Sequence, residues 1–437
     1  MTIEPGNDPV AVTPESAPTR PTLASFWHDL PREGRLLLSV VVLEFVGTGL
    51  VLPFSVVYLN EVRGFRLSDV GLLLALPPLV GFVVVGPGGR AIDALGARRI
   101  LAASLCLLVA GNTVLALASS LWLAGLGLVL NGVAFGVSWP ASQSFIATVV
   151  PPALRQRYFG VNFTLLNLGI GIGGILGGLL VDVDRLVTFQ VIYLVDAASY
   201  LPALFLVLVP LRHVAGRPVH DHDDPPEQLG YLAVLRRPAV ASLMLLGFAS
   251  SFVGYSQLNT GMPAFARAVG EVSTRGLGLA FAANTLVIVV LQLVVLQRID
   301  GYRRTRVIAV MSVVWAASWV LLGATGLVAC TVGATLLVAG CASVFAFGET
   351  LLQPTIPALV NDLAPDHLRG RYNALSSAAF QLAAIIAPPI AGFLIGHALG
   401  EVYIGLLVVG CLLVGAIAVL RLEPQLDPEV NGVRSHG

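Results

Sequence analysis

The sequence predicts an all-α membrane protein in which twelve transmembrane helices form two pseudo-symmetric six-helix bundles. Hydrophobic residues make up 56% of the 437 residues and charged residues 11%, whereas soluble proteins carry about 25% charged residues. A span of the hydrocarbon core needs about 20 apolar residues, and the chain offers twelve such segments. Residues 154–158 (LRQRY) recur about half a chain length later as residues 368–372 (LRGRY). A half-length repeat in an apolar chain is typical of membrane proteins built from two homologous bundles.

The apolar segments divide into two sets of six and so predict the domain boundaries. The predicted spans are approximately 36–59, 69–88, 99–118, 121–145, 158–181, 187–210, 239–262, 277–297, 306–325, 328–354, 372–396 and 402–421. The polar residues 212–236 are predicted to be a central linker between the bundles 36–211 and 237–421. The polar, proline-rich residues 1–35 are expected to be a disordered tail, and residues 422–437 a second tail.

The placement of arginine predicts the orientation in the membrane. Most arginines fall in the tails, the linker and the loops on the side of the N-terminus, among them Arg98, Arg155 and Arg369. Because positively charged loops remain in the cytosol, both termini are predicted to be cytosolic, in a bacterial inner (plasma) membrane. The formal net charge is zero, so bulk charge does not indicate a nucleic-acid partner.

The sequence does not contain the usual patterns of a metal site, a cofactor site or an enzyme. Its four cysteines lie inside apolar segments and form no CxxC pair, which argues against a metal site or a disulfide framework. Residues 220–224 (HDHDD) have a metal-like composition but are more typical of a solvated acidic linker. The chain has no GxxxxGK phosphate loop. We therefore expect no cofactor and no enzymatic activity.

The segment after the second predicted span carries a charged, glycine-containing motif. Residues 89–99 read GRAIDALGARR, which resembles the signature G-x-x-x-D-R-x-G-R-R/K of the major facilitator superfamily (MFS). The residues that match are Gly89, Asp93, Gly96 and Arg98. Glycine permits a tight turn, and a carboxylate there can accept hydrogen bonds from a neighbouring helix N-terminus. The resemblance, which covers residues 36–421, implies a secondary transporter in which Asp93 and Arg98 help to latch its halves. Alternatively, Asp93 is a helix cap and Arg98 a topology anchor.

The fifth predicted span contains five glycines at helical spacing, namely Gly169, Gly173, Gly174, Gly177 and Gly178. Small residues four positions apart let helix backbones approach closely in lipid. The pattern is similar to the G-x-x-x-G-P-x-x-G-G motif of the bacterial drug:proton antiporter (multidrug efflux) branch, with Gly174 in the proline place. That branch usually carries an arginine where this chain has Leu128. The alternative interpretation is a plain packing seam.

Three carboxylates fall inside predicted spans, where such a group costs about 2.5–3.5 kcal/mol or more. Glu349 shares a helix face with Gln353, in a span that lines the cavity of the resembled superfamily. It is expected either to exchange protons as water access alternates or to form a structural hydrogen bond to the first, fourth or eleventh span. Glu44 in the first span is also expected to face inward. Asp196 in the sixth span is expected to pair with another helix.

Neutral polar and aromatic residues complete the predicted cavity. The candidates besides Glu44 and Glu349 are Gln353, Asn131, Trp139, Tyr255 and Gln257. Aromatic side chains with a few hydrogen-bonding groups suit an apolar or amphipathic organic molecule. Each of these residues could instead serve helix packing.

Two arginine pairs precede the fifth and eleventh predicted spans at matching positions of the repeat. They are Arg155 and Arg157, and Arg369 and Arg371. We expect salt bridges between the halves that break during opening, with Asp93 and Asp300 as partners. Alternatively, the arginines only anchor the topology.

The sequence thus predicts a proton-coupled exporter of drug-like or small amphipathic molecules that works by alternating access. Its expected partners are a small-molecule substrate, protons and the lipid bilayer, and we expect it to be monomeric. Two alternatives stay open. One is an uptake or metabolite-exchange transporter for a sugar, an organic acid or a siderophore-like substrate, and the other is a non-transporting sensor with the same fold.

Overall fold

The computed structural model describes residues 23–214 and 230–433, and all regular secondary structure within these ranges is helical. The expectations for residues 1–22, for the HDHDD segment and for residues 434–437 concern positions outside these ranges. The expectation of a disordered tail up to residue 35 is wrong for its last part, because Leu23–Asp29 forms the helix α1 and α2 begins at Arg32. Phe26 and Leu30 are buried in one cluster with Tyr158, and this apolar contact accounts for the order.

The N-terminal half of the structure consists of six long helices and the short α3. Their bounds are α2 Arg32–Val51, α3 Ser55–Val57, α4 Leu67–Leu95, α5 Ala97–Leu117, α6 Leu121–Val149, α7 Pro152–Leu180 and α8 Leu186–Leu208. Local sequence explains two of the helix starts. Ser120 accepts a hydrogen bond from the backbone N–H of Leu123 at the start of α6, and Pro152 occupies the first position of α7, where proline has no hydrogen bond to lose.

The C-terminal half contains more broken helices. Their bounds are α9 Tyr231–Leu235, α10 Pro238–Ser250, α11 Met262–Ala268, α12 Thr274–Ile299, α13 Arg304–Gly323, α14 Val332–Leu352, α15 Thr355–Leu363, α16 Arg369–Gly396 and α17 Gly400–Ala416. Two π-helical turns, Ser251–Tyr255 and Gln257–Gly261, join α10 to α11. Such turns are frequent at functional sites, and this pair lies beside the cavity described below.

Twelve spans within the described residues are long and apolar enough to cross a membrane. This agrees with the predicted all-α fold, although the helix ends differ from the predicted segments. The helix α6 continues to Val149, beyond the predicted end at 145, and α7 begins at Pro152 rather than at 158. The polar residues 155–157 explain the earlier start of α7, because hydropathy detects only the part of a helix that lies in hydrocarbon and misses polar turns that project beyond it. Residues 146–149 (IATV) are mostly apolar, so this reason does not apply to the end of α6.

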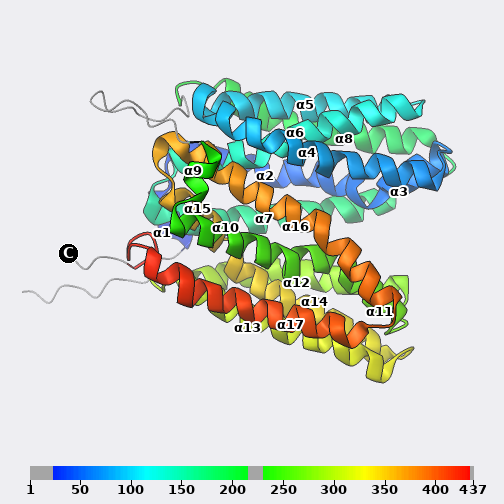
Figure 1. Ribbon diagram of the computed structural model, residues 1–437. Coiled ribbons are helices and arrows are strands. Elements are labelled where there is room, and N and C mark those ends of the chain that lie inside the picture. Colours follow the sequence, from blue (N-terminus) through cyan, green and yellow to red (C-terminus); the bar gives the residue numbers. More distant parts are fainter. Residues whose placement is uncertain (1–22, 215–229, 434–437) are drawn as a thin grey trace, which may run out of the picture.

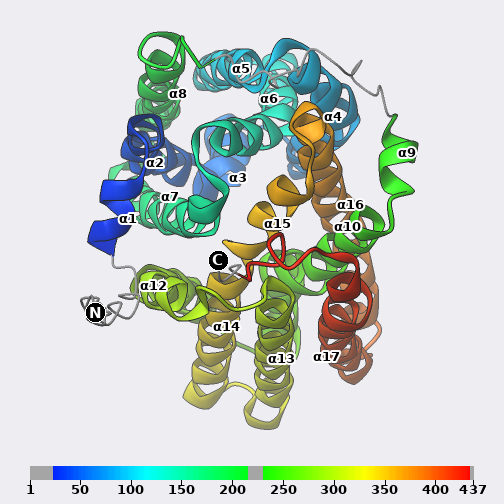
Figure 2. The ribbon, with the colours of Figure 1, turned by 90° about the vertical axis from the view of Figure 1, so that its left-hand side faces the viewer.

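The two halves lie side by side, and their two most extensive contacts are between α4 and α16 and between α7 and α12. Figure 1 shows α4, α5, α6 and α8 of the N-terminal half above α12, α13, α14 and α17 of the C-terminal half. The helices α4 and α16 lie close together at the end of the bundle that carries α9 and α15, and they diverge toward the other end (Figure 1). We call the first end, with the turn at Gly96 and the start of α16 at Arg369, the latched end; it faces the viewer in Figure 2.

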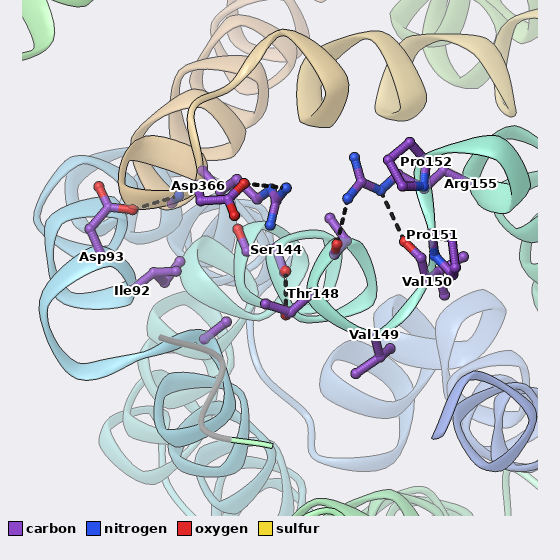
Figure 3. Close-up of a pocket in the computed structure, with 14 residues that line it drawn as sticks. Ile92, Asp93, Ser144, Thr148, Val149, Val150, Pro151, Pro152, Arg155 and Asp366 are labelled. Carbon is purple, nitrogen blue, oxygen red and sulfur yellow. Dashed lines mark hydrogen bonds and ion pairs between the residues drawn. The ribbon is translucent and has the colours of Figure 1, made fainter. Parts of the chain in front are cut away.

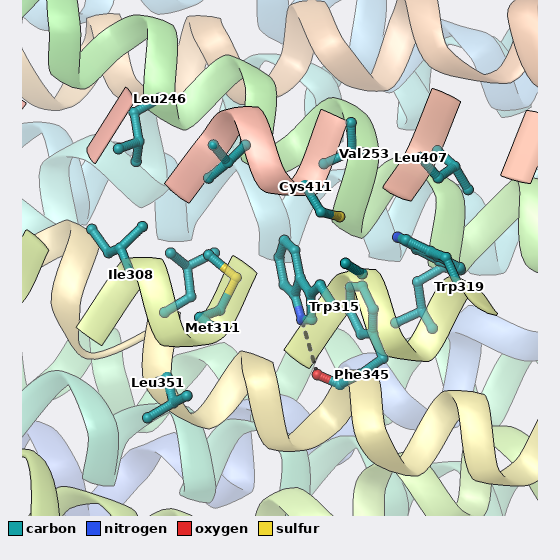
Figure 4. Packing of buried hydrophobic residues seen from close by; sticks show 14 of the residues in the cluster. Leu246, Val253, Ile308, Met311, Trp315, Trp319, Phe345, Leu351, Leu407 and Cys411 are labelled. Carbon is teal, nitrogen blue, oxygen red and sulfur yellow. Dashed lines mark hydrogen bonds between the residues drawn. The ribbon is translucent and has the colours of Figure 1, made fainter. Parts of the chain in front are cut away.

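Aromatic packing holds the core of the C-terminal half. The Trp315 ring of α13 stacks on the Phe345 ring of α14 with centroids 4.4 Å apart, and its Nε1–H donates to the Phe345 carbonyl oxygen at 3.0 Å (Figure 4). Burying the ring while satisfying its polar atom makes the contact favourable. The Tyr255 ring meets Trp315 edge-on at 5.6 Å. The core thereby fixes Tyr255 at the interface between the halves.

A glycine seam joins α7 to α2. A Cβ on Gly169 would lie 2.7 Å from the Val42 carbonyl oxygen, and one on Gly177 would lie 2.8 Å from the Leu50 carbonyl oxygen. Gly173 packs between them against Gly49, so these three glycines serve helix packing, as predicted. Gly174 and Gly178 do not, because a Cβ on either would meet its nearest atom only at 3.9 Å. The spacing of the glycines therefore predicted more residues in the seam than the structure places there.

Candidate functional site

A central cavity of about 580 Å³ lies between the two halves. It is lined by residues of α4, α6 and α7 from the N-terminal half and of α10, α14, α15 and α16 from the C-terminal half, together with Tyr255. The volume falls within the range of small-molecule sites, which are mostly apolar with a few placed polar groups. Because both halves contribute walls, any relative motion of the halves changes the shape of the cavity.

The wall from the N-terminal half is a stripe on α6. Phe135, Trp139 and Gln143 are spaced four residues apart and all line the cavity, as a single helix face requires. Phe135 is 50% exposed and Trp139 is 42% exposed, so both rings present surface to an occupant. Gln143 is buried. The sequence-based prediction placed Trp139 here, and it missed Phe135 on the same face.

The wall from the C-terminal half is built around Tyr255. Its hydroxyl accepts a hydrogen bond from Nε2 of Gln353 at 2.7 Å, and its ring packs on Phe380 of α16 with centroids 5.8 Å apart. Tyr255, Gln353 and Phe380 all line the cavity. Tyr255 and Gln353 therefore lie where the sequence predicted, and their part in substrate binding stays a prediction.

Two predicted cavity residues lie elsewhere. Asn131 donates to Oδ1 of Asn112 at 3.0 Å and so joins α6 to α5. Gln257 is buried and accepts from the hydroxyl of Tyr403 at 2.9 Å, on the α17 side of its own helix. The prediction that they line the cavity is wrong, because a polar residue in a span can satisfy a neighbouring helix as well as a substrate.

Glu349 lies in the protein interior next to the cavity wall. It is 4% exposed, and its Oε2 accepts a hydrogen bond from Nδ2 of Asn284 on α12 at 2.8 Å. It precedes the wall residue Gln353 by one helical turn but is not itself part of the lining. The expectation that Glu349 projects into the cavity is therefore wrong. Its carboxylate does form a structural hydrogen bond, but the partner helix is α12, the eighth span, and not the first, fourth or eleventh span as predicted.

Glu44 lies on the side of α2 that faces α8. Its backbone carbonyl accepts from the Ser199 hydroxyl at 3.3 Å, and one turn further along α2 the Thr48 and Tyr200 hydroxyls are 3.1 Å apart. Asp196 approaches the same stretch of α2, since a Cβ on Gly47 would lie 2.7 Å from its Oδ1. Glu44 does not line the cavity, contrary to prediction. Asp196 packs against another helix, as expected.

The motif after α4 contacts the other half of the molecule. Oδ1 of Asp93 accepts a hydrogen bond from the backbone N–H of Gly370, in the first turn of α16, at 2.7 Å. Nε of Arg371 lies 3.5 Å from the other carboxylate oxygen. A carboxylate at a helix N-terminus is stabilised by the helix dipole. The predicted partnership of Asp93 with a neighbouring helix is therefore present, and that helix belongs to the other half.

Two glycines permit this close approach. A Cβ on Gly370 would lie 2.5 Å from Oδ1 of Asp93 and 2.6 Å from the Gly89 carbonyl oxygen, while one on Gly89 would lie 3.0 Å from the Gly370 carbonyl oxygen. The hydroxyl of Tyr231 also contacts this crossing and donates to the Gly86 carbonyl oxygen. Burial raises the pKa of Tyr231, so its hydroxyl keeps the proton that it donates.

The predicted motif residues Gly96 and Arg98 serve the turn and the N-terminal half. Gly96 has φ +92°, a conformation that favours glycine, and it separates α4 from α5. Nη1 of Arg98 donates to the Val207 carbonyl oxygen of α8 at 3.4 Å. Arg98 therefore contacts its own half rather than bridging the two, and the latch role predicted for it does not fit this placement.

A buried carboxylate, Asp362 of α15, links the halves further. Its oxygens accept from Arg155 of α7 at 2.5 Å and from Arg304 of α13 at 2.7 Å. The three side chains are 5–9% exposed. The sequence analysis missed Asp362, although it lies just before the second copy of the repeated motif, where a partner for the first copy's arginines could be sought.

The remaining paired arginines differ from one another. Arg157 contacts Asp300 at 2.5 Å across the halves, as predicted. Arg369 pairs locally with Asp366 at 2.6 Å, so its predicted salt bridge between the halves is wrong. We call the contacts Asp93–Gly370, Arg155–Asp362–Arg304 and Arg157–Asp300 the latch.

A second pocket of about 300 Å³ lies within the latched end. Figure 3 shows Asp93 and Asp366 on one side of it, Arg155 on the other, and Ser144 and Thr148 of α6 between them. Both halves line this pocket too, and it lies beyond Gln143 along α6. The latch therefore separates the central cavity from this end of the molecule.

Comparison with known proteins places this architecture. Residues 37–273 and 270–436 match the Major Facilitator Superfamily. The chain is 26% identical to the uncharacterized MFS-type transporter YhjO of Bacillus subtilis (strain 168), over 86% of this chain and 90% of YhjO. It is 27% identical to the quinolone resistance protein NorA of Staphylococcus aureus, over 39% of this chain and 44% of NorA.

Solved structures share the fold at low sequence identity. A bacterial homologue of the iron transporter ferroportin in an outward-facing state superposes with a TM-score of 0.74 at 16% identity, covering 90% of this chain and 100% of that one. The human organic anion transporter MFSD10 (TETRAN) gives 0.67 at 16% identity, covering 91% and 100%. The family match over nearly the whole chain shows that the protein is a multi-pass membrane transporter of the Major Facilitator Superfamily, and its twelve apolar spans and the shared fold agree with this.

Proposed function

We propose that the protein exports small apolar or amphipathic organic molecules across the bacterial plasma membrane in exchange for protons. The observation that carries this proposal is the central cavity, whose exposed rings of Phe135, Trp139 and Phe380 surround a few neutral hydrogen-bonding groups. Aromatic surface binds apolar molecules of varied shape through burial rather than through directional contacts. Such a cavity suits drug-like compounds better than a sugar, which needs many paired hydrogen bonds.

The direction of transport is inferred from charge and from similarity. Arginine is concentrated at the latched end, which supports a cytosolic position for that end and makes the described conformation outward-facing. The likeness to NorA, a protein named for quinolone resistance, covers 39% of this chain and favours export over uptake. In this account substrate enters from the cytosol after the latch opens and leaves through the opposite end.

Proton coupling is assigned to Glu349. Its carboxyl group is buried and, among the described residues, accepts a hydrogen bond from the amide of Asn284. An ionisable group inside a span is costly and so marks a functional site. The backbone places Glu349 one turn from Gln353, which holds the Tyr255 hydroxyl at the cavity wall. Movement of this wall can expose the carboxyl to water from one side or the other. We do not assign this role to Glu44 as well, because Glu44 faces α8 and does not line the cavity.

The latch supplies the alternation. Opening the cytosolic end requires Asp93 to release Gly370, and Asp362 and Asp300 to release Arg155 and Arg157. Each of these contacts joins one half to the other, so they break together when the halves rock apart. Their loss is compensated in the other conformation by contacts at the opposite end.

Substrate-induced proton movement in proteoliposomes tests the proposal. Purified protein is reconstituted with a pH-sensitive dye inside, and a panel of neutral, cationic and anionic aromatic dyes is added without any imposed gradient. We expect at least one panel member to change the internal pH. When a proton gradient is then imposed, that compound should be concentrated, and a protonophore should abolish this concentrative transport. Transport that continues unchanged with the protonophore would favour uncoupled exchange. Absence of transport across the whole panel, with well-folded protein, would favour the sensor alternative.

A further inference from the structure

The central cavity contains polar atoms that no group in the described part of the chain satisfies. Among the described residues that line it, Oε1 of Gln143 and the hydroxyls of Ser250 and Ser377 are buried without a hydrogen-bond partner. Gln143 is 5% exposed. An acceptor held in this way is satisfied when a ligand brings a donor to it. These three atoms are therefore the candidates for directional contacts with a ligand.

The position of Gln143 defines the shape of the ligand around that contact. It follows Trp139 and Phe135 by one and two turns on the same face of α6. Phe380 of the opposite wall is 46% exposed. A flat aromatic molecule that reaches Gln143 with its edge would cover these rings with its faces, and stacking of this kind adds to apolar burial.

The charge of the lining defines the charge of the ligand. The lining residues of the cavity are aromatic, aliphatic, proline, glycine, amide and hydroxyl residues, all neutral. The nearby carboxyl of Glu349 is engaged by Asn284 behind the wall. An ion that enters such a site loses hydration without gaining a counter-ion, whereas a neutral molecule does not.

We propose that the cavity selects uncharged, flat aromatic molecules that carry an N–H or O–H donor, and that Gln143 is the residue that accepts this donor. The inference rests on the export function proposed above and specifies its substrate class. It differs from recognition of organic cations, for which a carboxylate in contact with the ligand would supply the counter-ion that this lining lacks.

Three probes of nearly equal size separate these features. Acridone is flat and neutral with an N–H, N-methylacridone lacks that N–H, and 10-methylacridinium is a permanent cation. Equilibrium dialysis against purified protein in detergent gives the three dissociation constants. We expect acridone to bind about tenfold or more tightly than either analogue, because losing one well-placed hydrogen bond or burying an unpaired charge each costs at least one decade.

Variants of Gln143 test its assignment. In Gln143→Leu the difference between acridone and N-methylacridone should disappear, and in Gln143→Glu the cation should gain about tenfold relative to acridone. Gln190→Leu is the matched control, since Gln190 lies on α8 away from the cavity, and it should leave all three constants unchanged. Thermal unfolding of each variant checks that it is folded.

The comparison of the three probes on the unmodified protein can overturn the proposal without any variant. Equal binding of acridone and N-methylacridone would contradict the donor requirement, tighter binding of 10-methylacridinium would contradict the neutral class, and no binding of acridone would contradict both. Because dialysis involves no membrane or proton gradient, this result is independent of the proteoliposome result. Selective binding without proton movement would retain the ligand class and reject the coupled export.

Discussion

The carboxylate of Asp93 accepts a hydrogen bond from the backbone N–H of Gly370, 2.7 Å away, across the boundary between the two halves of the transporter. The donor belongs to the first turn of α16, so the contact uses a backbone group that the helix itself leaves unsatisfied. The two backbones cross at Gly89 and Gly370, where neither residue has room for a Cβ. The charge of Asp93, the N-terminus of α16 and the close packing of the two backbones therefore all stabilise the same contact between the halves.

Replacing Asp93 with Asn should weaken the latch. The amide can still accept from Gly370, but its interaction with the helix dipole and with Arg371 loses the charge, which corresponds to about 1–2 kcal/mol. The population of the latched state should fall by about tenfold relative to the open state. Electron–electron distance measurements between spin labels at Arg99→Cys and Tyr302→Cys, two exposed positions, report this shift when the native cysteines are replaced. An unchanged distance distribution would contradict a latch role for Asp93.

Replacing Gly370 with Ala should open the latch more strongly. The added methyl group would overlap Asp93 and the Gly89 carbonyl oxygen, and backbone cannot move aside as a flexible side chain can. Gly392→Ala on the same helix is the matched control, because nothing lies within 4 Å of its Cβ position. When the same two spin labels at positions 99 and 302 are used, Gly370→Ala should lengthen the distance between them, whereas Gly392→Ala should not. Similar behaviour of the two variants would show that the crossing tolerates a side chain.

Removing the charge of Asp362 should destabilise the described conformation severely. The variant Asp362→Asn leaves the buried guanidinium groups of Arg155 and Arg304 without a counter-ion, at a cost of about 3–5 kcal/mol. Thermal unfolding in detergent should show a lower midpoint, or the spin-label distance should show a shift to the open state. Asp366→Asn, which affects an ion pair with a 57% exposed carboxylate, should change neither by much, because exposed pairs contribute about 0–1 kcal/mol.

The glycine seam between α7 and α2 makes a prediction about stability alone. A methyl group on Gly173 would lie 2.8 Å from the Cα of Gly49, so Gly173→Ala should lower the stability of the N-terminal half by about 1–3 kcal/mol. Gly178→Ala should be neutral, since its Cβ meets only Phe54 at 3.9 Å. Thermal unfolding of the two variants makes the comparison. Equal unfolding midpoints for Gly173→Ala and Gly178→Ala would indicate that α7 and α2 can move apart to accommodate the methyl group without loss of stability.

The sequence was sufficient for features that depend on local pattern. Apolar length predicts the spans, and the short motif around Asp93 predicts a carboxylate at a turn beside a helix end, because both are properties of consecutive residues. Trp139 was also predicted at the cavity, and it lies there on one face of α6. These features survive folding because the helix itself determines them.

The sequence was insufficient where the rotation of a helix against its neighbours decides the outcome. Periodicity places Glu44, Asn131 and Gln257 on definite faces, but only packing shows that these faces meet α8, α5 and α17 instead of the cavity. Asp362 was missed for a related reason, since its partner Arg155 is distant in the sequence and belongs to the N-terminal half of the molecule. Contacts between distant segments are not encoded in local spacing.

Proton coupling through Glu349 is tested most directly by comparing the variant Glu349→Gln with the control Glu401→Gln. The carboxylate of Glu401 is exposed at the start of α17. Both variants are reconstituted into liposomes, and proton flux and substrate exchange are recorded with the panel dye that gives the largest signal in the unmodified protein. The account predicts that Glu349→Gln keeps substrate exchange but loses substrate-driven proton flux, while Glu401→Gln keeps both. Proton flux at the unmodified rate in Glu349→Gln would contradict it.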